Sequence, residues 1–196
     1  RIKAMSVVQR ELNNFSPEQW REYKALDDRK AVAVLERNGS LYFYRKAMAF
    51  QKKYADGKHI HNTLQTNATL ITREWAEFFR ANNFLIGVSL DGPQNVHDRY
   101  RGGKGGASVF DRVIKGIMEL YRAGVQYNVM ATVNRQSEGR GLEIYQFLKS
   151  AGTRFIQFMP VLEHTKDGLI VDPQVQGARI APWSVSPEGY GRFLCD

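Results

Sequence analysis

The chain has 196 residues, of which 43% are apolar and 12% aromatic, and this composition excludes an intrinsically disordered protein and suits one globular domain. Its 28 Lys and Arg residues outnumber its 20 Asp and Glu residues, but the net charge of +8 is spread along the chain, which favours a solvated basic surface over a dedicated nucleic-acid face. The single cysteine, Cys195, excludes an internal disulfide and any cysteine-built zinc or iron–sulfur site within this chain alone.

The N-terminal part of the chain carries two competing patterns. Residues 1–30 are polar and predict helix, without the basic-then-apolar layout of a signal peptide. Asn38 and Gly39 suit a type I′ turn between strands at residues 31–35 and 41–44. The spacing of later apolar residues instead predicts a helix from about residue 43, which we favour, leaving residues 31–41 unassigned. No apolar run approaches the roughly 20 residues that span a bilayer, so we expect a cytoplasmic protein with no membrane partner.

From residue 61 onward, strands and helices alternate regularly. Runs rich in β-branched and aromatic residues predict strands at residues 61–66, 84–90, 127–133 and 154–159. Apolar residues at helical spacing predict helices at residues 72–82, 108–123 and 141–151, with Thr72 as the N-cap of the first and Ser186 starting a last helix. Glycines and prolines predict irregular connections at residues 91–107 and 162–183. This order predicts an α/β fold with a parallel sheet, although periodicity does not distinguish an open barrel from a doubly wound sheet.

Two polar segments end neighbouring predicted strands, namely Gln65-Thr66-Asn67 and the sequence SLDGP at residues 89–93. With HDRYR at residues 97–101 and FIQFMP at residues 155–160, these segments resemble the anaerobic sulfatase-maturating branch of the radical S-adenosylmethionine (SAM) enzymes. The resemblance implies a partial (β/α) barrel of the radical SAM type. It divides the chain into an unmatched helical segment at residues 1–40, a barrel core at 41–164, and an irregular connection with the start of a helix at 165–196.

The resemblance also implies which side chains face SAM at the carboxyl ends of the strands, although it assigns no catalytic residue. Amides and hydroxyls there suit a cofactor that carries a carboxylate, an amine and ribose hydroxyls. Asp91 either binds ligand groups or caps a turn, and the Arg101 guanidinium suits a carboxylate. The predicted cofactor-binding residues are Gln65, Thr66, Asn67, Ser89, Asp91, Arg101 and Gln157.

In such enzymes, by resemblance, a 4Fe-4S cluster and SAM serve the oxidation of a sulfatase cysteine or serine to formylglycine. The cluster requires a CxxxCxxC loop, and residues 1–40 hold neither this loop nor the GGEP strand end of the family. We therefore predict that this chain, a fragment or degenerate copy, has no metal site and by itself neither holds a cluster nor cleaves SAM. The alternative is a non-catalytic remnant or regulator that binds SAM, a sulfatase or nucleic acid.

Overall fold

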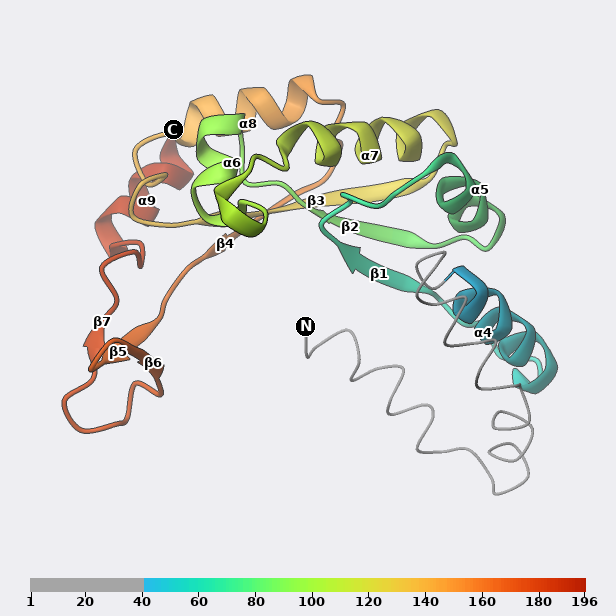
Figure 1. The fold of residues 1–196 in the computed structure, drawn as a ribbon, viewed down its shortest axis with the longest axis horizontal. Helices are drawn as coiled ribbons and strands as arrows, with labels where there is room; N and C mark the ends of the chain where they lie inside the picture. The colour runs from blue at the N-terminus through green and yellow to red at the C-terminus, as the bar shows by residue number, and fades with distance from the viewer. Residues whose placement is uncertain (1–40) are drawn as a thin grey trace.

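The computed structural model describes residues 41–196, apart from the side chains of Tyr42 and Lys104, and shows the predicted α/β fold. Its main sheet contains four parallel strands in the order β1 (Thr63–Thr66), β2 (Leu85–Ser89), β3 (Gln126–Val133) and β4 (Ile156–Pro160). The larger helices are α4 (Leu41–Tyr54), α5 (Arg73–Ala81), α7 (Phe110–Arg122), α8 (Gly141–Ser150) and α9 (Pro187–Cys195). Helices α5, α7 and α8 lie over one face of the sheet (Figure 1), as in the partial (β/α) barrel predicted from the resemblance.

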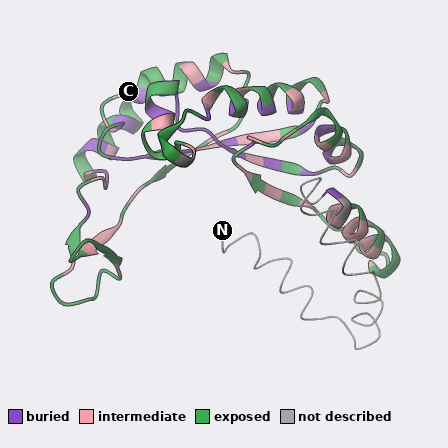
Figure 2. Ribbon diagram, viewed as in Figure 1, coloured by how far each residue is buried: buried purple, intermediate pink, exposed green. Residues whose placement is uncertain are grey.

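The two faces of the main sheet have opposite character. Alternate strand residues point to opposite sides, and Ile86, Val88 and Val129 lie fully buried beneath the helices. Figure 2 shows how the burial concentrates where the helices meet the sheet. The opposite side, which we call the open face, is covered by no helix within residues 41–196. The open face carries Gln65, Gly87, Ser89, Asn128, Met130 and Gln157.

Local sequence signals account for most element boundaries. The Thr72 side chain accepts a hydrogen bond from the Trp75 backbone N–H and caps α5, as predicted, and Ser186 caps α9 in the same way through the Gly189 N–H. Gly124 and Gly152 follow α7 and α8 with φ values of 68° and 81°, a conformation that glycine adopts readily. The predicted strands and helices between residues 61 and 160 are confirmed to within a few residues at each end.

The predicted loop at residues 91–107 is wrong, because this segment contains helix α6 (Gln94–Arg101) and a 3-10 turn, η1 (Lys104–Gly106). Pro93 stands at the N-cap of α6, and Val96 and His97 are buried on its inner side. The burial of these two residues supports a helix of only two turns despite its polar sequence. Gly102 stands at the C-cap of α6, where the helix ends.

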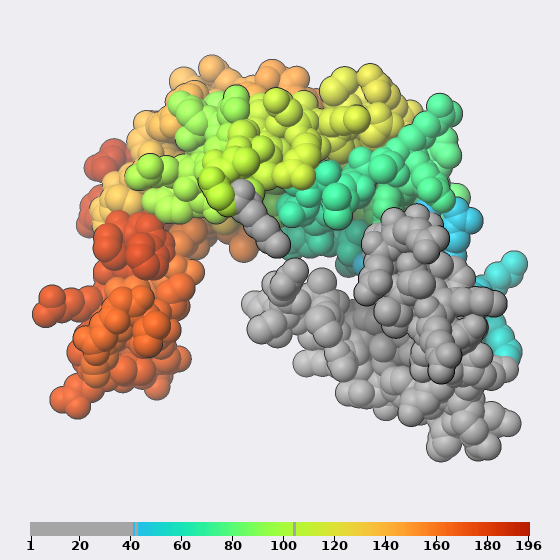
Figure 3. Space-filling model, in the orientation of Figure 1, coloured from blue at the N-terminus to red at the C-terminus, as the bar shows by residue number. Residues whose placement is uncertain are grey.

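The predicted irregular connection at residues 162–183 is also wrong. It contains an antiparallel sheet in the order β6-β5-β7, formed by β5 (His164–Lys166), β6 (Leu169–Val171) and β7 (Arg179–Ile180). Asp167 and Gly168, with φ values of 52° and 78°, form the tight turn between β5 and β6. Figure 3 shows this sheet, in orange, as an arm that projects from the main body.

The N-terminal predictions fall largely on residues outside the described part of the chain. The helix predicted for residues 1–30 and the strand predicted at 31–35 lie there. Residues 41–44 belong to α4, so the strand alternative for them is wrong and the helix is confirmed. Among the described helices, none is long and apolar enough to cross a membrane.

Candidate functional site

The open face carries two adjacent rows of side chains that run across the strands. Gln65, Gly87 and Asn128 are in register across β1, β2 and β3, and Ser89, Met130 and Gln157 form the next row toward the carboxyl ends. A Cβ atom at Gly87 would lie 3.3 Å from the Asn128 Oδ1 atom and 3.7 Å from the Gln65 Cγ atom. Gly87 therefore leaves a gap that side chains from both neighbouring strands border.

The polar side chains of these rows are not used by the fold. Within residues 41–196, the side chains of Gln65, Ser89, Asn128 and Gln157 make no hydrogen bond. Amide and hydroxyl groups without protein partners can donate to and accept from a bound ligand. The carboxyl ends of parallel strands are where α/β proteins place such ligands.

Thr66 and Asn67 have a local structural role. The Thr66 Oγ1 atom accepts a hydrogen bond from the Ala68 N–H at 3.1 Å, and the Asn67 Oδ1 atom accepts from the Thr69 N–H at 3.2 Å and from its hydroxyl at 2.9 Å. Ala68 is buried with a φ of 58°. Its carbonyl oxygen lies where a Cβ atom at Gly116 would be, so the turn packs directly on α7. The hydrogen bonds of Thr66 and Asn67 therefore stabilise the turn that follows Gln65.

Asp91 and Arg101 bind each other. The Arg101 Nε and Nη2 atoms donate to the Asp91 Oδ2 and Oδ1 atoms at 2.6 and 3.1 Å, and the Thr132 N–H donates to Oδ1 at 2.8 Å. Only 2% of Asp91 is exposed. The buried carboxylate thus joins the end of β2 to α6 and to β3, and charged hydrogen bonds offset the cost of its burial.

His97 lies against this ion pair and is 1% exposed. Its Nδ1 atom accepts a hydrogen bond from the Asp91 N–H at 3.4 Å, while the buried Nε2 atom has no partner within residues 41–196. Burial lowers the pKa of His97, which the Asp91 carboxylate opposes and the Arg101 guanidinium reinforces. The imidazole is therefore neutral near pH 7.

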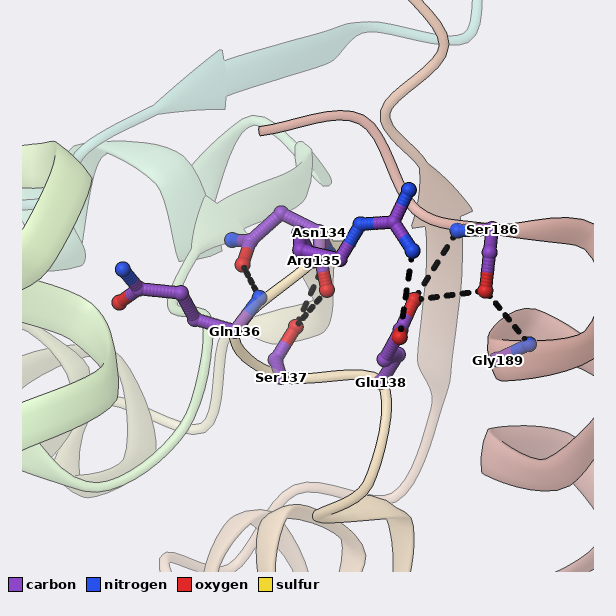
Figure 4. Close-up of polar contacts among 7 residues, drawn as sticks. All are labelled: Asn134, Arg135, Gln136, Ser137, Glu138, Ser186 and Gly189. Carbon is purple, nitrogen blue, oxygen red and sulfur yellow. Dashed lines mark hydrogen bonds and ion pairs between the residues drawn. The ribbon is translucent and has the colours of Figure 1, made fainter. Parts of the chain in front are cut away.

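A second polar cluster, which we call the α8–α9 junction, follows the carboxyl end of β3 (Figure 4). The Glu138 Oε2 atom accepts hydrogen bonds from the Ser186 N–H at 2.9 Å and its hydroxyl at 3.0 Å. Arg135 forms an ion pair with Glu138 at 3.6 Å. The backbone hydrogen bond from Ser186 is the main cause that holds the pKa of Glu138 below its usual value. The junction fixes the start of α9 beside the sheet.

The described residues do not fit an iron–sulfur cluster. Three thiolates are needed, whereas the chain holds only Cys195, which is exposed at the end of α9. Across residues 41–196 no three His, Cys, Asp or Glu side chains gather as a metal-binding group. The imidazole rings of His59 and His61 lie 4.4 Å apart, but two ligands do not complete a metal site.

Three open-face residues at the gap, Gly87, Asn128 and Met130, are not among the predicted cofactor-binding residues. Glycine inside a strand often marks a place where a ligand or another backbone approaches closely. Gly87 within LIGVS carries that signal in the sequence. Met130 carries none, because an apolar residue in a strand is equally compatible with the core.

Comparisons with known proteins find relatives by sequence and by fold. No family model matches the sequence. A serine-type anaerobic sulfatase-maturating enzyme of Bacteroides thetaiotaomicron is 48% identical over 160 residues, which cover 79% of this chain and 39% of that protein. A cysteine-type anaerobic sulfatase-maturating enzyme of Clostridium novyi is 37% identical over 153 residues, 78% of this chain and 38% of its own length.

The solved structure of native anSMEcpe with bound AdoMet and Kp18Cys peptide matches this fold with a TM-score of 0.67 at 29% identity. The match covers 79% of this chain and 40% of that one. The chain thus spans about two fifths of the length of the proteins that it matches.

Proposed function

Because the chain is a partial homologue of the anaerobic sulfatase-maturating enzymes, we propose that its open face binds SAM as part of a maturase-like core. The observation that carries this proposal is the set of four polar side chains on the open face that the fold leaves without partners within residues 41–196. AdoMet is bound in matched structures at 29% identity over 79% of this chain, which supports the same assignment.

The residues divide into those that contact SAM and those that position them. Gln65, Ser89, Asn128 and Gln157 present amides and a hydroxyl to the carboxylate, amine and ribose groups of SAM, and Gly87 leaves room between them. Among the other predicted contacts, Thr66 and Asn67 shape the turn after β1. Asp91 and Arg101 hold β2, α6 and β3 together and position Ser89.

Bound SAM would supply the radical chemistry of the family only with a cluster, and this chain's residues do not furnish one. We therefore assign the formation of formylglycine in a sulfatase to a longer protein with the missing cysteines, and SAM binding to the segment described. The peptide in the matched structure supports a sulfatase segment as the partner. The single cysteine favours, as a second candidate, a non-catalytic protein that binds SAM or a sulfatase.

Isothermal titration calorimetry of SAM into the 196-residue chain tests the proposal. We expect saturable one-to-one binding that is lost in Gly87→Val, because the added side chain fills the gap beside Asn128. Absence of binding to the unsubstituted chain, with its fold verified by circular dichroism, would remove the proposal. Anaerobic reconstitution addresses the cluster separately, since iron and sulfide bound at cluster stoichiometry would contradict the expected lack of a cluster.

A further inference from the structure

A groove of about 770 Å³ lies between α5 and α7, on the helical side of the molecule and away from the open face. One wall comes from the turn after β1 and the start of α5, and the other comes from α7. We call it the α5–α7 groove. Its lining residues that matter here are Leu70, Arg73, Glu77, Arg112, Lys115 and Arg122.

The groove carries an excess of positive charge. Arg73 is paired with Glu77 at 2.7 Å, and Arg122 is paired with Glu119 at 3.1 Å. Arg112 and Lys115 also line the groove, and neither has an acidic partner among residues 41–196. Because residues three apart on a helix are neighbours, these two cations form a pair on the side of α7 that faces the groove.

The groove also has an apolar component. Leu70, at the tip of the turn after β1, is 73% exposed, and Ile71 and Ala123 lie further inside the lining. An exposed leucine beside two uncompensated cations is complementary to a peptide that carries both carboxylates and a large apolar side chain.

We propose that the α5–α7 groove binds an acidic segment of a protein partner, with carboxylates on Arg112 and Lys115 and an apolar side chain against Leu70. A nucleic acid fits less well, because Glu77 and Glu119 interrupt the positive surface that a continuous phosphate backbone would follow, whereas a peptide can place its few carboxylates at Arg112 and Lys115 and its apolar side chain on Leu70. This surface is separate from the open face, and its occupation does not depend on SAM.

Fluorescence anisotropy tests the groove with a fluorescein-labelled peptide in which one leucine is flanked on each side by two glutamates. We expect Arg112→Glu with Lys115→Glu to weaken binding about tenfold, because each reversal replaces an attraction by a repulsion. The matched control is Lys58→Glu with Arg154→Glu, which makes the same charge change at exposed residues outside the groove and leaves binding unchanged. Leu70→Ala, at an exposed position that the fold does not need, should weaken binding about threefold.

Three outcomes would overturn the proposal. One is an equal loss of affinity in both charge-reversed pairs, which would mean non-specific attraction to a basic protein. Another is unchanged binding in Arg112→Glu with Lys115→Glu, with the fold intact by circular dichroism. The third is tighter binding of single-stranded oligothymidylate at the same salt concentration, weakened by the same two substitutions, which would assign the groove to nucleic acid.

Discussion

The open face and the α8–α9 junction both carry polar side chains, but these side chains have different roles in the two regions. On the open face, Gln65, Ser89, Asn128 and Gln157 make no hydrogen bond within the described chain. At the junction, the carboxylate of Glu138 accepts two hydrogen bonds from Ser186 and pairs with Arg135. Polar groups that are paired in this way fix the tertiary structure, whereas polar groups left without partners are available to a ligand.

The glycines of the open face and the α8–α9 junction also differ in what an added Cβ atom would contact. On the open face, a Cβ atom at Gly87 would lie 3.3 Å from the Asn128 Oδ1 atom, a tight contact with a side chain that makes no hydrogen bond in the described chain. At the junction, a Cβ atom at Gly189 would overlap the Glu138 carboxylate, and one at Gly141 would overlap the Phe193 carbonyl oxygen. The first glycine leaves room for a ligand, and the other two allow close packing of α9.

The strongest test of this contrast is Gly141→Ala. The added methyl group must push α9 away from α8, which separates Phe193 from Phe158, whose ring centroids lie 4.9 Å apart. We expect the free energy of unfolding to fall by about 3 kcal/mol in urea denaturation followed by circular dichroism. The control is Gly139→Ala, since a Cβ atom there meets no atom within 4 Å. Equal effects of the two substitutions would show that the junction is not closely packed.

Glu138→Ala is expected to have the next largest effect. It leaves the half-buried Ser186 N–H without its acceptor and removes a carboxylate that is 16% exposed, at a cost of about 2 kcal/mol. The control is Glu143→Ala, which breaks the ion pair of Glu143 with Arg140. Because the Glu143 side chain is 50% exposed, this substitution should lower the free energy of unfolding by no more than about 0.5 kcal/mol.

The pH dependence of Glu138→Ala has a defined sign. Because the pKa of Glu138 is lowered in the folded chain, its stabilisation is present above the unfolded value of 4.5 and is lost as the pH falls through the folded pKa. The variant should therefore lose less stability than the unsubstituted chain below about pH 4.5. Parallel unfolding curves for the two proteins across that range would argue against this role.

The sequence predicted the main sheet because each strand and helix carries its own periodic pattern, and these patterns agree with the parallel order found. It also placed Gln65, Ser89 and Gln157 in predicted strands, which the structure confirms. The helix α6 was missed because its stability comes from the burial of Val96 and His97, a tertiary effect that polar residues in the sequence conceal. The β5–β6 hairpin was missed although Asp167 and Gly168 carry a local turn signal.

The pairing of Asp91 with Arg101 was not predictable in the same way. The sequence leaves Asp91 either as a ligand-binding group or as the cap of a turn and predicts Arg101 as a ligand contact, and their ten-residue separation gives no sign of contact unless α6 is known. The α8–α9 junction poses the same difficulty, because Glu138 and Ser186 are 48 residues apart. Long-range polar pairs form only when the helices and strands pack together, and no local sequence pattern predicts that packing.

His97 combines the features of the α8–α9 junction and the open face, since its Nδ1 atom accepts a hydrogen bond and its Nε2 atom has no partner within residues 41–196. Its pKa is lowered below 6.5 in the folded chain, so the unfolded chain binds the proton first and stability is lost as the pH falls below about 6.5. We expect the free energy of unfolding to fall progressively as the pH is lowered from 6.5. His97→Asn, which keeps an acceptor for the Asp91 N–H, should flatten this slope, whereas exposed His61→Asn should leave it unchanged.

The smallest effects on stability are expected on the open face. Asn128→Ala and Gln157→Ala remove side chains that make no hydrogen bond in the described chain, so each should change the free energy of unfolding by less than about 0.5 kcal/mol. Each should nevertheless weaken SAM binding about tenfold in calorimetry, the effect of one lost ligand hydrogen bond. Gln126→Ala provides the control, because Gln126 lies on the same face at the amino end of β3, one row further than Asn128 from the carboxyl ends of the strands. If Asn128→Ala and Gln157→Ala instead destabilise the chain as Glu138→Ala does, the open face is held by its own polar contacts and the division between ligand surface and architecture fails.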